Sequence, residues 1–264
     1  MALRMGVLVL FAVVAVVVFL VGDKLRPKSW RHSDDEASST MVLDLVNMFF
    51  AAIVAFVVVI LWQQYDTAHA HTVSEAKGLV TVYEAANDLP DDYRIQIQGL
   101  TREYTKQVVG DEWDVMDSER RLSPDAQDTF DDLRSTVSAI PGTDPDVKAL
   151  QDKADTALDA VAEARYDRAL DAEYKLPGFL YIALWFGTGM LLLGTVLSGV
   201  MVTKRSVLMT ALFGLVIGGV IVAIYQLDQP FAGGNTVSKE AYELAMSRFQ
   251  QITSSSTVGA LLPR

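Results

Sequence analysis

The second apolar segment of the chain, residues 41–62, constrains the fold more than any other stretch. It is long enough to cross the roughly 30 Å hydrocarbon layer of a bilayer, which takes about 20 apolar residues in an α-helix. No Pro or Gly interrupts the sequence from Met41 to Lys77, so the helix is predicted to continue from the membrane into water. Trp62 and Tyr65 then lie at the membrane–water interface, where aromatic side chains are enriched.

Three further apolar segments predict three more membrane-spanning helices, at residues 5–22, 178–202 and 207–227. For the first segment a cleaved signal peptide is the alternative, although its basic start is weak and no small-x-small cleavage site precedes Asp23. The last two segments are joined by a tight turn that holds Lys204 and Arg205, so they are predicted to form a helical hairpin.

Acidic residues are concentrated between the second and third apolar segments. Residues 64–175 contain 25 Asp and Glu against 12 Lys and Arg, and the formal net charge of the whole chain is −11. This distribution indicates a membrane protein with one acidic extramembrane domain at residues 63–176. It argues against a nucleic-acid partner, because phosphate binding needs clustered Lys and Arg. The chain has no Cys, which excludes disulfides and thiolate chemistry.

The acidic domain shows helical periodicity throughout and no strand alternation. Four helices are predicted there: the continuation of the membrane helix to about Asn87, residues 91–109, residues 123–140, and residues 143–176. Each helix presents one apolar stripe, so a four-helix bundle buries all of them. Residues 228–264 are predicted to form a C-terminal tail with one short helix at residues 240–252.

The predicted fold class is therefore an all-α membrane protein with four transmembrane helices. Residues 1–62 hold the first two, residues 177–227 hold the last two, and the extramembrane helical bundle is inserted between helices 2 and 3. Lys and Arg in the 23–40 loop and in the 204–205 turn predict that both short loops lie in the cytoplasm. In a plasma membrane the acidic domain and both termini are then extracytoplasmic.

Candidate functional residues lie on the second apolar helix. Phe49, Ile53 and Phe56 share one face, and in an oligomer such a face forms an apolar constriction that gates by dewetting. A lipid-facing stripe is the simpler alternative for a single helix. Asn47 is interpreted as an interhelical hydrogen-bonding group. Small residues at four-residue spacing let helices approach closely, and they are Gly194 with Ser198 and Gly214 with Gly218.

Nothing in the sequence supports an enzyme. It contains no Gly-rich phosphate loop, no Gly-x-Ser-x-Gly elbow and no His-Glu-x-x-His motif. His69 and His71 are two residues apart and point to different faces of a helix, so they do not chelate a metal together. We therefore expect no catalytic residue, no bound metal and no cofactor.

A short motif lies at the C-terminal end of each of the second and fourth apolar segments. The residues of the two motifs are Trp62, Gln63, Tyr65, Asp66, Asp228, Pro230 and Phe231. With these motifs in this context, the chain resembles the bestrophin-like family of bacterial integral membrane proteins over nearly its whole length. Bestrophins are pentameric anion channels with a pore lined by the second span. The resemblance therefore implies a homo-oligomeric channel with Phe49, Ile53 and Phe56 at the pore neck. It also implies a cytoplasmic middle segment, opposite to the orientation that the loop charges predict.

Two functions follow from these observations. The first is an oligomeric ion channel whose partners are the lipid bilayer, further copies of the chain, and ions. The second is a membrane-anchored scaffold that presents the acidic helical bundle to a partner protein. The strong negative charge of the bundle repels anions, which weighs against the anion selectivity that the resemblance implies.

Overall fold

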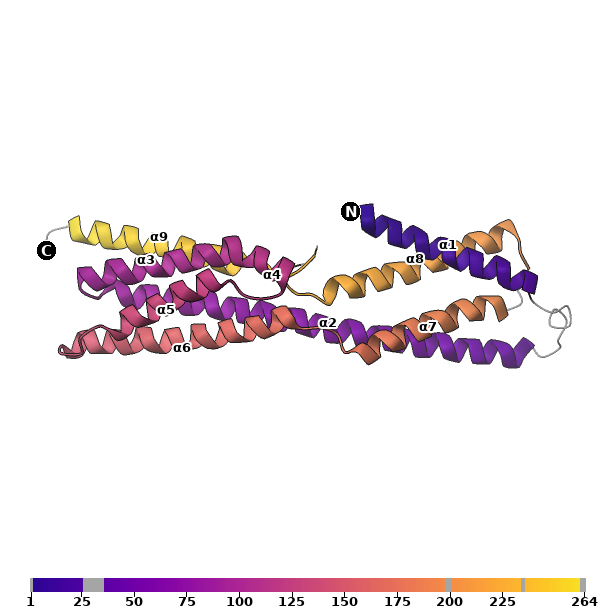
Figure 1. Cartoon of the computed structure of the whole chain (residues 1–264), viewed down its shortest axis with the longest axis horizontal. Helices are drawn as coiled ribbons and strands as arrows, with labels where there is room; N and C mark the ends of the chain where they lie inside the picture. Colours follow the sequence, from indigo (N-terminus) through magenta and orange to yellow (C-terminus); the bar gives the residue numbers. More distant parts are fainter. Residues whose placement is uncertain (1, 26–35, 198–200, 234–235, 262–264) are drawn as a thin grey trace. The chain divides into compact units, whose positions relative to one another are not determined.

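The computed structural model describes residues 2–25, 36–197, 201–233 and 236–261, and these are helical apart from short connections (Figure 1). The elements in chain order are α1 (Ala2–Leu25), α2 (Glu36–Asn87), α3 (Asp91–Gln107), the π-helix η2 (Val108–Glu112), α4 (Trp113–Glu119), α5 (Pro124–Ser138), α6 (Pro145–Glu173), α7 (Gly178–Leu197), α8 (Lys204–Leu227) and α9 (Glu240–Leu261). No strand occurs in the described ranges, so the predicted all-α class is confirmed.

The chain divides into two compact units. Unit 1 consists of Met1–Gln63 and Lys175–Asp228, and unit 2 consists of Gln64–Tyr174 and Gln229–Arg264. Helix α2 runs unbroken for 52 residues and contributes its first half to unit 1 and its second half to unit 2. The absence of Pro and Gly from Glu36 to Lys77 is the local reason for this continuity.

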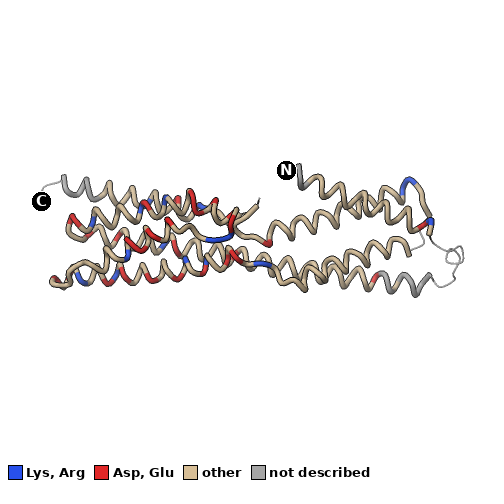
Figure 2. The backbone as a smooth tube through the Cα atoms, in the orientation of Figure 1, with Lys and Arg blue, Asp and Glu red and all other residues tan. Residues whose placement is uncertain are grey.

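Unit 1 contains the apolar helices. Four helical segments of the described chain are long and apolar enough to cross a membrane, and they include α1, the first half of α2, α7 and α8. Figure 2 shows that Lys, Arg, Asp and Glu are nearly absent from these helices except near their ends. Lys204 and Arg205 were expected in a turn but form the first residues of α8, because Thr203 and Ser206 make a capping box that starts the helix there.

Close helix packing in unit 1 depends on small residues. A Cβ atom added at Gly214 of α8 would lie 2.7 Å from the carbonyl oxygen of Phe11 in α1, and one at Gly218 would lie 2.9 Å from the Phe11 Cβ. Only glycine allows α8 to approach α1 this closely. Gly194 of α7 is also buried, whereas Ser198 lies outside the described residues.

Unit 2 has its own hydrophobic core, which includes residues of α2, α3, α5, α6 and α9. The C-terminal segment, predicted as a tail with a short helix, instead carries the 22-residue helix α9. Phe249 of α9 is buried and stacks on Tyr83 of α2 with ring centroids 4.4 Å apart. The helix predicted at 91–109 also extends further, through η2 and α4, and ends where Arg120 adopts a left-handed conformation with φ 56°. The core of unit 2 is therefore built from more helices than the four predicted.

Candidate functional site

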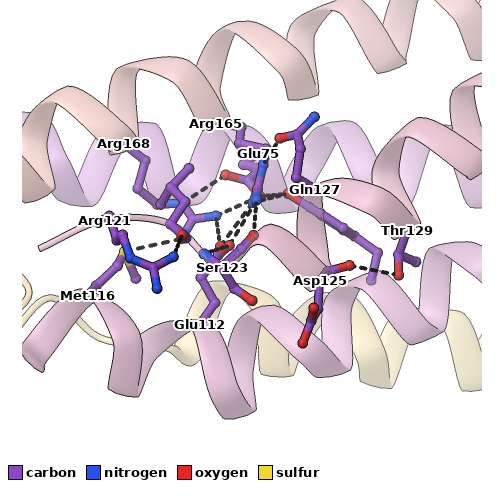
Figure 3. A network of polar contacts seen from close by, with 12 residues as sticks. Glu75, Glu112, Met116, Arg121, Ser123, Asp125, Gln127, Thr129, Arg165 and Arg168 are labelled. Carbon is purple, nitrogen blue, oxygen red and sulfur yellow. Dashed lines mark hydrogen bonds and ion pairs between the residues drawn. The ribbon is translucent and has the colours of Figure 1, made fainter. Parts of the chain in front are cut away.

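Four charged side chains lie in the core of unit 2. Glu75 of α2, Glu112 of η2, and Arg165 and Arg168 of α6 are each at most 3% exposed. Arg168 donates hydrogen bonds to Glu75 at 2.9 and 3.1 Å and a third to Glu112 at 2.6 Å. Arg165 donates two hydrogen bonds to Glu112 at 2.9 and 2.8 Å (Figure 3). Two positive and two negative charges therefore neutralise each other inside the bundle.

Neighbouring polar groups complete the hydrogen bonds of this buried ion network, by which we mean Glu75, Glu112, Arg165 and Arg168. They are the Tyr104 hydroxyl, which donates to Glu75, the Ser123 backbone N–H, which donates to Glu112 at 2.9 Å, and the side-chain oxygen of Gln127, which accepts from Arg165 at 2.9 Å. Both arginines also lie over aromatic rings, with Arg165 5.4 Å from the Tyr104 centroid. A buried ion pair stabilises a fold only when its remaining hydrogen bonds are satisfied in this way.

The π-helix η2 brings Glu112 into this network. Tyr104, Val108 and Glu112 are all buried and follow one another at four-residue steps. In a regular α-helix two such steps drift about 80° around the axis. The wider π turn reduces that drift and keeps Glu112 on the buried face, and insertions of this kind are frequent at functional sites.

The electrostatics of the network hold its groups in fixed protonation states. Burial alone would raise the pKa of Glu112, but the attraction of Arg168 and Arg165 and their hydrogen bonds outweigh burial and hold this pKa below its ordinary value. Burial, with the nearby charge of Glu75, raises the pKa of Tyr104 well above its ordinary value. Glu112 is therefore ionised and Tyr104 protonated near neutral pH, which suits a structural role and not proton transfer.

A second polar cluster in unit 2 joins α2 to α6. His71 Nδ1 lies 2.7 Å from Asp171 Oδ2, and Gln64 donates to the other Asp171 oxygen at 2.9 Å. Burial raises the pKa of Asp171, and its hydrogen bond with His71 offsets part of that rise. Within the residues that the structure describes, no three His, Cys, Asp or Glu side chains are grouped so as to hold a metal ion.

In unit 1, the residues proposed for a pore do not share one environment. Phe49 and Phe56 are 73% and 59% exposed and lie on an uncovered face of α2. Ile53 is half-buried and packs against the core cluster that contains Val57 and Leu61. Asn47 is exposed and lines a separate cavity of unit 1. The three residues lie at i, i+4 and i+7 on one face of α2, where Ile53 is partly covered within unit 1 and Phe49 and Phe56 are not.

The motif residues near the ends of the second and fourth apolar segments make structural contacts within each unit. In unit 1, Asp228 accepts a hydrogen bond from the Leu176 backbone N–H and another from the Tyr181 hydroxyl, both at 2.6 Å. These bonds tie the end of α8 to the start of α7. Trp62, Gln63 and Asp66 are exposed on α2.

In unit 2, Phe231 is buried and meets the Trp113 ring edge-to-face, with centroids 5.5 Å apart. The Pro230 carbonyl accepts a hydrogen bond from the Val237 backbone N–H at 2.7 Å, which closes the turn between α8 and α9. Tyr65 donates to the Thr236 carbonyl at 3.4 Å. These motif residues thus hold the C-terminal segment in unit 2.

The sequence predicted an acidic helical domain but not the buried ion network. A signal was nevertheless present. The apolar stripe of the helix at 143–176 follows a 3-4 spacing through Val161 and Ala164, and its next position is Arg168. A charged residue at a core position indicates a buried partner of opposite charge.

Comparisons with known proteins agree with this architecture. The Bestrophin-like domain model matches residues 9–242, which is most of the sequence. The chain belongs to the bestrophin-like family. This bestrophin-like protein is accordingly an integral membrane protein, as the apolar helices of unit 1 require. No curated protein matches the sequence.

Solved structures show the same fold. Crystal structures of a bacterial bestrophin homologue from Klebsiella pneumoniae, two of its single-substitution variants, superpose with a TM-score of 0.66 each at 13% and 12% identity. A crystal structure described as a membrane protein variant gives a TM-score of 0.67 at 11% identity. In each case the match covers 96% of this chain and 98% of the other. At this identity the likeness concerns the fold.

Replacing Arg168 tests the buried ion network. Arg168→Met leaves Glu75 without its ion-pair partner in the core, so we expect the free energy of unfolding to fall by about 3–5 kcal/mol. Arg134→Met is the matched control, because Arg134 pairs with Asp159 at the surface and its loss is expected to cost no more than about 1 kcal/mol. Denaturant unfolding of the full chain in detergent measures both, and equal losses would contradict the role of the network.

Acid is expected to weaken the network through Glu112. Its folded-state pKa is lower than its unfolded value, so its contribution is complete above the unfolded pKa of about 4.3 and is lost as pH falls through the folded pKa. Unfolding midpoints measured from pH 7 downward should therefore fall less steeply below about pH 4 in Glu112→Gln than in the unmodified chain. Glu163→Gln, at an exposed position of α6, should keep the original slope.

Proposed function

We propose that this bestrophin-like protein is an oligomeric ion channel of the plasma membrane in which α2 lines the pore. The observation that carries the proposal is the uncovered apolar face of α2. Leu45, Phe49, Phe56 and Val59 are each more than half exposed, and Ala52 between them is also exposed. Their successive spacing of 4, 3, 4 and 3 residues is that of a seam between helices, and within the part of the chain that the structure describes no other helix covers these side chains.

In an oligomer, such faces from several copies of the chain form a ring that can act as a gate for ions. Phenylalanine side chains that converge on one axis form an apolar constriction, which closes to ions when water leaves it. Bestrophins are ion channels, and membership of the bestrophin-like family supports the same role here. The competing interpretation is that Phe49 and Phe56 simply face lipid, and conductance measurements on variants of α2 distinguish the two interpretations.

The charge of unit 2 bears on which ions are conducted. Asp and Glu are distributed along its helices (Figure 2) and outnumber Lys and Arg by 25 to 12 in residues 64–175. The negative electrostatic potential of this unit lowers the local concentration of anions and raises that of cations. Reversal potentials in asymmetric salt measure the selectivity directly.

Conduction is tested with single substitutions in α2. Purified full chain in a planar bilayer should conduct, and Phe56→Ser should raise the current at a given voltage about threefold or more, because a hydroxyl lowers the cost of wetting the constriction. The matched control is Phe186→Ser on α7, where the side chain is 69% exposed, and its current should be unchanged. No current over a range of salt and pH, together with a monomer on sizing, would remove the proposal, as would equal currents from the two variants.

The orientation of unit 2 is a separate proposal, that it lies outside the cytoplasm. The basic residues of the 23–40 loop and the first turn of α8 support it, whereas the resemblance to bestrophins implies the opposite. The chain has no Cys, so single cysteines report on sidedness. Ala160→Cys, at an exposed position of α6, should react with an impermeant maleimide in intact cells, and Lys204→Cys only after permeabilisation. The reverse pattern would place unit 2 in the cytoplasm.

A further inference from the structure

Unit 1 contains a cavity of about 1180 Å³ that the proposed pore does not use. It is lined by α2 and α8, with contributions from Phe19 of α1 and from Leu191, Gly194 and Thr195 of α7. The residues of α2 that line it are different from Phe49 and Phe56, so the cavity and the uncovered face lie on different sides of this helix.

The lining of the cavity changes from polar to apolar along both helices. At the start of α8 the lining consists of the N-cap Thr203 with Arg205 and Ser206; Met209 and Thr210 follow, and from Phe213 to Val220 the lining is apolar. On α2 the lining begins with Asp44 and Asn47 and continues with apolar residues to Ala55. The polar end therefore coincides with the ends of the membrane-spanning segments, at the depth of lipid headgroups, and the apolar end lies along their hydrocarbon-spanning parts.

The polar end carries one charge of each sign. Asp44 and Arg205 both line the cavity and are exposed, and neither forms an ion pair with another residue that the structure describes. An ammonium group satisfies a carboxylate, and a phosphate group satisfies a guanidinium, through short charge-assisted hydrogen bonds. A ligand that carries both groups on one headgroup, followed by acyl chains, matches the lining from one end to the other.

We infer that this cavity binds a zwitterionic phospholipid with a primary amine in its headgroup, such as phosphatidylethanolamine. The amine pairs with Asp44, the phosphate with Arg205, and the acyl chains fill the apolar part beside Phe50 and Phe213. A quaternary ammonium headgroup has no N–H to donate, and an anionic headgroup leaves Asp44 unpaired. A helix from a second copy would cover the two charges with apolar side chains, at a desolvation cost that a zwitterion avoids. The inference does not depend on whether the protein conducts ions.

Lipid retention by the full chain tests this inference. The protein is incubated with mixed micelles that contain equal amounts of phosphatidylethanolamine, phosphatidylcholine and phosphatidylglycerol, and native mass spectrometry counts the lipids that remain bound. We expect phosphatidylethanolamine to be retained preferentially, and Arg205→Gln to lower the retention of phospholipid about tenfold. Lys204→Gln is the matched control. Lys204 carries the positive charge next to Arg205 in the sequence but does not line the cavity, so this variant should retain as much phospholipid as the unmodified chain.

Two further substitutions separate headgroup from acyl-chain recognition. Asp44→Asn should remove the preference for phosphatidylethanolamine over phosphatidylcholine while phospholipid is still retained. Ala51→Phe fills the cavity and should abolish retention, whereas Leu208→Phe, at an exposed position of α8 outside the cavity, should not. Melting temperature and subunit number are recorded for every variant, so that loss of folding is recognised.

Several outcomes would overturn the inference. Retained lipids in the proportions of the mixture, or a preference for phosphatidylglycerol, would exclude recognition of the zwitterion. Equal retention by Arg205→Gln and Lys204→Gln would exclude the role of Arg205. A change of subunit number in Ala51→Phe without a change in retained lipid would show that a second copy, and not a lipid, fills the cavity.

Discussion

Mutual neutralisation of two carboxylates and two guanidiniums is the interaction on which unit 2 depends. Removing an ion from water costs several kcal/mol, so Glu75, Glu112, Arg165 and Arg168 are stable in the core only when all four are aligned. They come from α2, η2 and α6, and a slip of one helix by a turn would separate the charges. Apolar seams alone tolerate such a slip much better, because one aliphatic side chain replaces another. The network therefore fixes the register of the helices in a bundle whose apolar contacts would tolerate other registers.

Unit 1 obeys a different constraint. Its apolar helices satisfy their own backbone hydrogen bonds, and in lipid they gain little from hiding apolar side chains, so close packing depends on small residues. Gly214 against Phe11 is the clearest case, because a Cβ atom at this position would collide with backbone atoms of α1. Asp228 is the polar counterpart, since its carboxylate accepts hydrogen bonds from the Leu176 backbone N–H and the Tyr181 hydroxyl, where α7 begins and α8 ends.

Helix α2 meets three environments on three faces of its apolar half. Val57 and Leu61 pack inside unit 1, Phe50 faces the cavity, and Phe49 and Phe56 lie on the uncovered face. The proposed partners follow the same division: the chain's own helices, a phospholipid, and further copies of the chain. A helix used in this way is constrained along most of its circumference, which fits its role among the described helices as the one that contributes to both units.

The sequence by itself determined which segments are helical and which of them lie in lipid or in water. Apolar runs of membrane length, an acidic segment and the absence of Pro and Gly from Glu36 to Lys77 are local properties, because helix formation depends on residues within a turn of one another. The apolar stripe of the helix at 143–176, with its 3-4 spacing, includes Arg168 and so indicates that this charged side chain is buried. Only the tertiary structure decided that its partner is Glu75, 93 residues away, and that α9 joins the same core. Which faces meet depends on shape and charge summed over all the helices, and no single helix carries that information in its own periodicity.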